Sequence, residues 1–75
     1  MDIKITRQIY NDIWAYHKKF IEIQNDEKFL KSMISEKDEL CKKYYENPFA
    51  TEMIFVVFKS LIESWKEKYV PPEQT

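Results

Sequence analysis

The chain has 75 residues, of which 44% are hydrophobic, 16% aromatic and 33% charged, and 12 basic against 13 acidic side chains give a formal net charge of -1. This composition argues against a disordered chain, and the balanced charge disfavours binding to phosphate backbones or to anionic lipid. A chain of this length forms one domain whose folding leaves only a small surplus of stability, so a partner subunit would help it.

The first predicted helix covers about residues 6–24, with Thr6 as its N-cap. The chain has no glycine, which favours long helices joined by tight corners of asparagine, aspartate and proline. In this first helix the apolar side chains recur at helical spacing and share one face. They are Ile9, Ile13, Tyr16, Phe20 and Ile23.

A second helix is predicted over about residues 26–46, with Asn25 or Asp26 as its cap. Its apolar residues form a main stripe with a second row beside it. The main stripe is Phe29, Met33, Leu40 and Tyr44, and the second row is Leu30, Ile34, Cys41 and Tyr45.

Two features of this second helix leave alternatives open. Lys37 falls within the apolar arc, so either its stem lies over the core with its head in water, or it pairs with an acid on another chain. Ser35 could cap a fresh helical start with Asp38 at the capping-box position, so the helix is either continuous or broken there.

A third helix is predicted over about residues 48–69, because proline disfavours helix in the residue before it and suits the first helical position. Pro71 and Pro72 cannot continue the helix, so residues 71–75 are expected to be a frayed tail after a single helical domain, residues 1–70. Three helices of similar length with short connections predict an all-α, antiparallel three-helix bundle, up-down-up, with assembly as a homodimer left open.

Two helices carry more apolar surface than one neighbour requires. In the third helix the apolar residues cover about half the circumference, and in the first helix Tyr10, Trp14, His17 and Ile21 form an additional stripe. Either this surplus is ordinary core, or it is a protein interface, for which tryptophan and tyrosine are typical. The interface residues predicted on this second interpretation are Tyr10, Trp14, Ile21, Phe55 and Val56.

The sequence predicts no catalytic residue, metal site or cofactor. His17 is the single histidine and has no sequence neighbours at the spacing of a metal site or a general base. Cys41 sits on an apolar helical face, where a thiol usually serves packing. The acids Glu36, Asp38 and Glu39 are expected on a solvated face, so we do not expect an enzyme.

No segment predicts a membrane span, because the longest apolar run, residues 53–58, is far below the roughly 18 residues that a bilayer requires. The first residues lack the pattern of a signal peptide. A lone cysteine, which cannot form an internal disulfide, fits the reducing cytoplasm best.

At WAYHKKF, and again at DELCKKYYENPFATEMIFVVFKSLIESW, the chain resembles small uncharacterised helical proteins of Gram-positive bacterial phages and mobile elements. The resemblance covers about two thirds of the chain and implies a small accessory factor that binds a host or element protein; it carries over no catalytic residue.

Three functional hypotheses follow from the sequence. The first is an interaction module or accessory regulator that binds a protein partner, self-associates, or does both through its helix faces. The second is a DNA-binding transcriptional regulator, which the interspersed acids and the absence of an evident tight turn disfavour. The third is an enzyme whose site is formed between subunits.

Overall fold

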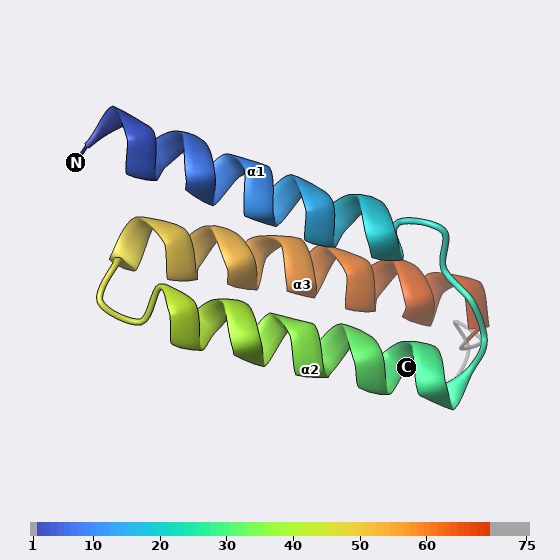
Figure 1. The fold of residues 1–75 in the computed structure, drawn as a ribbon. Helices are drawn as coiled ribbons and strands as arrows, with labels where there is room; N and C mark the ends of the chain where they lie inside the picture. Colours follow the sequence, from blue (N-terminus) through green and yellow to red (C-terminus); the bar gives the residue numbers. More distant parts are fainter. Residues whose placement is uncertain (1, 70–75) are drawn as a thin grey trace.

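A computed structural model describes residues 2–69, and within them it contains three helices: α1 (Ile3–Phe20), α2 (Glu27–Lys43) and α3 (Pro48–Tyr69). α1 and α3 run in the same direction, and α2 runs in the opposite direction (Figure 1). Each helix contacts the other two. The predicted all-α, antiparallel three-helix bundle is therefore confirmed.

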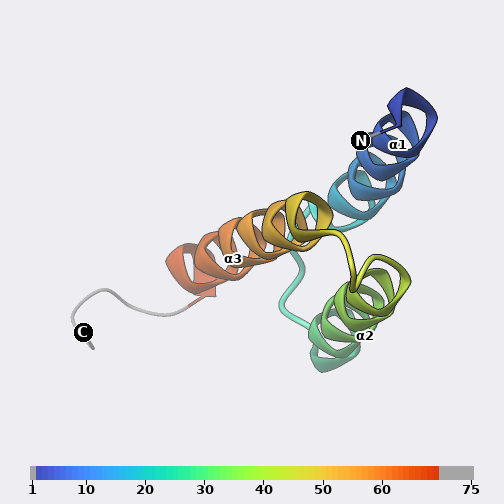
Figure 2. The ribbon, with the colours of Figure 1, turned by 90° about the vertical axis from the view of Figure 1, so that its left-hand side faces the viewer.

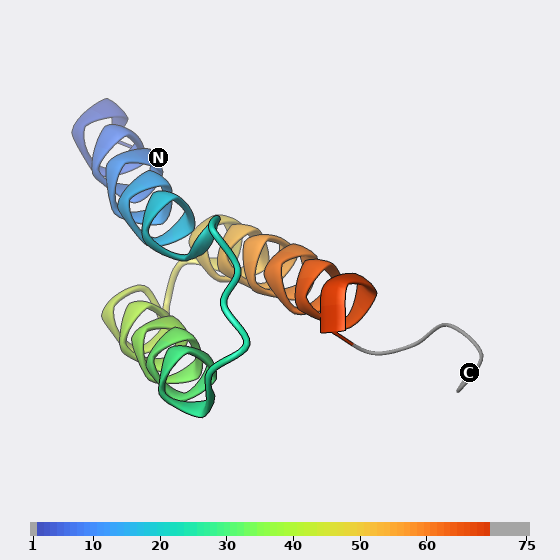
Figure 3. The same ribbon diagram turned by 90° about the vertical axis from the view of Figure 1, so that its right-hand side faces the viewer.

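The bundle is elongated, with extents of 46 × 22 × 17 Å. Viewed toward either end, the three helices occupy the corners of a triangle (Figures 2 and 3). One side of this triangle is formed by α1 and α3, and α2 lies behind it. No other described segment covers that side (Figure 3).

Short polar side chains set the first residue of each helix. The N-cap of α1 is Asp2, whose carboxylate accepts a hydrogen bond from the Lys4 amide at 3.0 Å. The prediction of Thr6 as cap was wrong: Thr6 lies in the first turns of the helix, and its hydroxyl donates to the Asp2 carbonyl. Asp26, one of the two caps predicted from the sequence, caps α2. α3 begins at Pro48, also as predicted, and the Asn47 side chain accepts from the amide of its third residue, Ala50, at 3.1 Å.

Two helices end earlier than the sequence predicted. α1 stops at Phe20, because the chain crosses to α2 and the Ile23 carbonyl accepts hydrogen bonds from Tyr69 Oη at 3.2 Å and Lys68 Nζ at 3.5 Å. α2 stops at Lys43, where Tyr44 leaves the helical region and its carbonyl accepts from the Asn47 amide in a tight turn. Both ends are thus decided by contacts outside the helix concerned.

α2 is continuous through Ser35, so the open question of a break there is resolved. Asp38 is not a capping residue, because its carboxylate binds Lys37 Nζ at 2.7 Å. The expected frayed tail, residues 71–75, lies outside the described residues. Within the described part, no helix is long and apolar enough to cross a membrane.

The core has two clusters along the bundle axis, and Leu40 and Val57 pack against both. The cluster near the start of α1 joins α1 to α3 and to the end of α2 through buried side chains: Ile9, Ile13, Tyr44, Ala50 and Ile54. The cluster near the end of α1 contains Tyr16, Phe20, Met33 and Leu61. Partly buried Phe49 and Met53 of α3 pack against the first cluster, whereas Tyr10 and Trp14 on the outer face of α1 belong to neither cluster.

Candidate functional site

The five predicted interface residues are all exposed. Their exposed fractions are 51% for Tyr10, 57% for Trp14, 53% for Ile21, 54% for Phe55 and 68% for Val56. Because more than half of each residue remains in water, the interpretation that they are ordinary core does not hold in the isolated chain. Their use as an interface stays a prediction.

The structure brings Tyr10 of α1 together with the first turns of α3. The Tyr10 ring meets Phe49 edge to face, with centroids 5.8 Å apart and planes at 74°. Phe49 in turn shares a shallow apolar hollow with Met53 and Val56. An apolar surface therefore continues from one helix to the other.

Further along the same side, the Trp14 ring lies against His17, with centroids 6.5 Å apart. Ile21 lines a hollow with Ser64 and Lys68 of α3. We call this whole side the α1–α3 surface. It comprises Tyr10, Trp14, Ile21, Phe49, Met53 and Val56.

Phe55 does not belong to this surface. Lys37 of α2 holds its Nζ 5.8 Å from the centre of the Phe55 ring and 4.8 Å from that of Phe58, so Phe55 faces the α2–α3 seam. The sequence placed Phe55 and Val56 in one interface, but consecutive helical residues point about 100° apart and here they face different seams.

The position of Lys37 is compatible with the first arrangement considered from the sequence, because its ammonium forms an exposed hydrogen bond. Its side chain is 16% exposed, and its ammonium binds Asp38 of the same helix while lying over the Phe58 ring. An adjacent carboxylate and an aromatic face together compensate for the lost hydration of the charge. No acid from another chain is needed.

Sequence reasoning missed several exposed apolar residues. Ile34 and Tyr45 were assigned to the apolar row of the second helix, yet they are exposed. Ile3 at the start of α1 is exposed as well. The signal that could have identified Ile34 and Tyr45 is their position at the far margin of the stripe, beyond the arc that one flanking helix can cover.

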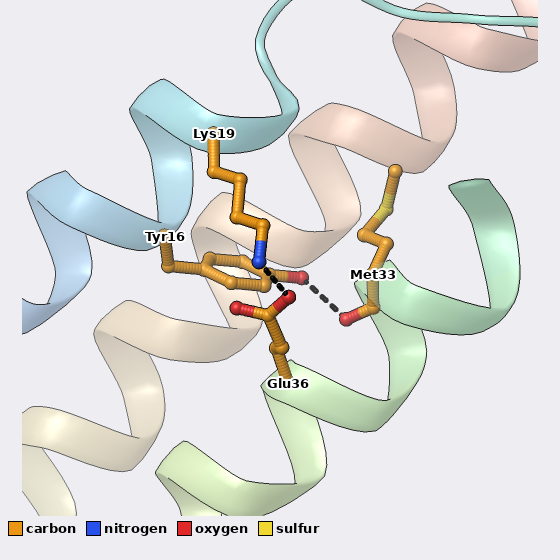
Figure 4. Close-up of polar contacts among 4 residues, drawn as sticks. All are labelled: Tyr16, Lys19, Met33 and Glu36. Carbon is orange, nitrogen blue, oxygen red and sulfur yellow. Dashed lines mark hydrogen bonds and ion pairs between the residues drawn. The ribbon is translucent and has the colours of Figure 1, made fainter. Parts of the chain in front are cut away.

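The opposite seam, between α1 and α2, is polar, and its charges are paired. Lys19 binds Glu36 at 2.6 Å, beside a buried hydrogen bond of 3.0 Å from Tyr16 Oη to the Met33 carbonyl (Figure 4). Burial of the Tyr16 ring, with the charge of Glu36 nearby, raises the pKa of its hydroxyl. The hydroxyl therefore stays protonated and available as a donor.

Elsewhere along this seam, Lys43 Nζ and Tyr44 Oη both bind Asp12 Oδ2. Burial alone raises the pKa of the Asp12 carboxyl, but the hydrogen bonds from Lys43 and Tyr44 outweigh it and hold the pKa below its usual value. The hydrogen bond to Asp12 raises the pKa of Lys43 in return. These three groups bind one another and so fix α1 against α2.

The single histidine and the single cysteine lie on different helices. His17 lies against Trp14 at the margin of the α1–α3 surface, and Cys41 is a half-buried free thiol packed against the first core cluster. Among residues 2–69, no three histidine, cysteine or acidic side chains come close enough together to hold a metal ion. The geometry thus directs attention to the α1–α3 surface.

No family model matches the chain, and neither the curated proteins nor the solved structures include a match.

Proposed function

We propose that this protein is a small interaction module that binds protein through its α1–α3 surface. The observation that carries the proposal is the exposure of Tyr10, Trp14 and Val56, with Tyr10 joined through Phe49 to the hollow that Val56 lines. Contiguous apolar surface of this kind is unfavourable in water, and on soluble domains it commonly marks a binding site.

The chemistry of the surface suits a protein partner better than other ligands. Tryptophan and tyrosine are among the residues most often found at the energetic centre of protein interfaces, since they bury a large area and keep a polar group. The exposed charges around Trp14 and Val56 are of both signs: α1 carries Arg7 and Lys18, and α3 carries Glu52 and Glu63. Nucleic acid would require a predominantly basic surface.

For the biological setting we propose an accessory factor of a phage or mobile element that regulates a protein of its host or element. The resemblance of the WAYHKKF segment and of the segment around the Asn-Pro-Phe corner supports this setting. A cytoplasmic location is proposed because the chain has a single cysteine and therefore cannot form an internal disulfide.

Site-specific photo-cross-linking tests the proposed function. A photoreactive phenylalanine replaces Trp14 in one variant and Ser35 in another; Ser35 is exposed on α2, outside the α1–α3 surface. We expect a protein adduct of defined mass from position 14, in purified samples or in cells that produce the protein, and none from position 35.

A second substitution makes the test specific. Val56→Asp places a charge within the α1–α3 surface and should abolish the adduct from position 14, while circular dichroism shows whether the helices persist. If position 14 gives no more adduct than position 35 in both settings, the α1–α3 surface is not a protein interface.

A further inference from the structure

The two outer edges of the α1–α3 surface carry charges of opposite sign. On α1, exposed Arg7 and Lys18 flank Trp14 at positions i, i+7 and i+11, which lie on one side of a helix. On α3, Glu52 and Glu63 flank exposed Val56 at positions i, i+4 and i+11. One edge is therefore basic and the other acidic, with an apolar side chain inside each.

The spacing of the two edges is identical. Arg7 and Lys18 are 11 residues apart, and so are Glu52 and Glu63. At a rise of about 1.5 Å per residue, each pair spans about 16.5 Å, or close to three full turns. A surface that carries one pair can therefore oppose both charges of the other pair at once.

The heights of the two edges along the bundle also correspond. Ile21 lines a hollow with Ser64 and Lys68, so it lies level with that turn of α3. Lys18 precedes Ile21 by three residues, and Glu63 precedes Ser64 by one, which places Lys18 and Glu63 within about one turn of each other.

Arg7 and Glu52 differ in height by the same amount as Lys18 and Glu63, because both pairs are 11 residues apart on helices that run in the same direction. The contact of Tyr10 with Phe49 places the acid of each pair further along the axis, so the long side chains of Arg7 and Lys18 have to extend toward it.

The symmetry of a dimer decides which edges meet. A two-fold axis that lies across the helices would set α1 on α1 of the other copy, basic edge against basic edge and acidic against acidic. A two-fold axis parallel to the helices sets α1 on α3 of the other copy and keeps every residue at its height. Since α1 and α3 run in the same direction (Figure 1), only the second arrangement brings each basic edge to an acidic edge, and it does so twice.

Other exposed charges near these edges are Lys59 and Glu67 on α3, and Glu22 just beyond α1. Lys59 lies about 10.5 Å beyond Glu52, and the exposed amide of Asn11 lies about 6 Å beyond Arg7, so the long lysine side chain can donate a hydrogen bond to that amide. Glu22 follows Lys18 by four residues and Glu67 follows Glu63 by four, so the parallel arrangement sets these two acids against each other. Each half of the interface therefore joins two opposite-charge pairs and one like-charge pair.

We propose that the partner bound by the α1–α3 surface is a second copy of this chain, in a two-fold dimer that pairs α1 with α3 of its partner. This inference rests on the proposed function and names its partner. Trp14 and Val56 form the apolar centre of the interface. Lys18 with Glu63 and Arg7 with Glu52 are its two opposite-charge pairs, and their equal spacing defines its register.

The available area limits the size of the interface. α1, with 18 residues, spans about 27 Å, and two adjacent helices are about 20 Å wide, so each copy offers about 540 Å². Twice that value is about 1,100 Å², close to the lower limit for a specific interface. An interface of this size belongs to the weak, transient class, so the dimer is expected to be reversible and to form only at high protein concentration.

Sedimentation velocity across about 1 μM to 1 mM tests the proposal on the intact chain. The wild type should shift reversibly from monomer to dimer. Lys18→Glu alone and Glu63→Lys alone should each weaken the dimer by about tenfold or more, because each sets two like charges against each other twice. Lys28→Glu, an equal charge change on exposed α2, should leave the dimer unchanged.

Mixing the two weakened variants provides the decisive outcome. In a mixed dimer, one contact joins the new glutamate of the Lys18→Glu copy to the new lysine of the Glu63→Lys copy. The other contact keeps the original lysine and glutamate, so both contacts join opposite charges and the mixture should dimerise as tightly as the wild type. Circular dichroism of each variant shows whether the bundle is folded. No general effect on folding or net charge produces recovery on mixing.

A wild type that stays monomeric over the whole range overturns the second-copy proposal, and so does a mixture that dimerises no better than its components. In either case an adduct from position 14 to a different protein leaves the proposed function standing with another partner. No adduct at all removes both proposals.

Discussion

Tyr16→Phe is the substitution for which the structure gives the clearest expectation. The Tyr16 residue is only 3% exposed, and its hydroxyl donates a 3.0 Å hydrogen bond to the Met33 carbonyl across the α1–α2 seam (Figure 4). Removing the hydroxyl keeps the ring, which packs on Phe20 with centroids 5.3 Å apart. The Met33 carbonyl lies inside α2, so it keeps its helical donor.

The variant therefore loses one hydrogen bond without leaving a buried group unsatisfied. We expect the free energy of unfolding to fall by about 1 kcal/mol. For a domain of this length, that change lowers the melting temperature by about 4–8 °C. Urea unfolding followed by helical circular dichroism measures the first quantity, and a thermal scan measures the second.

The stability that the Tyr16 hydroxyl contributes should depend on pH in the alkaline range. Burial of Tyr16, followed by the charge of Glu36, raises the pKa of its hydroxyl above the ordinary value of 10.0. A raised pKa in the folded state means that the associated stability is present below pH 10 and is lost as pH rises toward the folded pKa. The difference in stability between wild type and Tyr16→Phe should therefore shrink above about pH 10.

Tyr10→Phe is the matched control, because Tyr10 is exposed on the same helix and loses the same atom. Its free energy of unfolding should stay within about 0.5 kcal/mol of the wild type. If Tyr16→Phe is as stable as the wild type, the hydrogen bond to Met33 does no more than offset the burial of the hydroxyl. The pairing of α1 with α2 would then depend on apolar packing and the surface ion pairs.

Two further substitutions test the local structure by urea unfolding. Asn47→Ala removes the side-chain acceptor of the Ala50 amide and should lower the free energy of unfolding by about 1 kcal/mol. Asn47→Asp keeps an acceptor and should retain most of that stability, so an equal loss of stability in the two variants would contradict the capping role. Burial raises the pKa of Asp12, but the hydrogen bonds from Lys43 and Tyr44 outweigh it, so the pKa of the carboxyl is lowered in the folded protein. The stability that Asp12 contributes is therefore present above the unfolded pKa of about 3.9 and is lost as pH falls through the folded pKa. Asp12→Asn should therefore lose less stability than the wild type between about pH 5 and 2, and parallel pH profiles would count against this assignment.

The fold class could be predicted from the sequence because it depends on local signals that survive in any context. Apolar residues at helical spacing, an Asn-Pro corner and Asp26 before the second helix all act within one turn of the chain. Those signals indicated the number and order of the helices and the first residues of α2 and α3. The start of α1 was misjudged because Thr6 and Asp2 are both competent caps, and local pattern does not rank them.

The candidate site could be predicted from the sequence only in part. Helical spacing placed Tyr10, Trp14 and Ile21 in one row, and the structure leaves all three exposed. It separated Phe55 from Val56, since the position of Lys37 across the α2–α3 seam decides which neighbour Phe55 meets. A single helical wheel cannot contain that information.

Three amphipathic helices follow from the amino-acid order, because each helix depends on residues close together along the chain. The last residue of α1 does not follow from it, because the Ile23 carbonyl beyond that helix binds Lys68 and Tyr69 at the far end of α3. The amino-acid order also does not determine which apolar residues remain exposed. A bundle of three helices can cover only the inward arc of each one, and which arc faces inward is set by the packing of all three together.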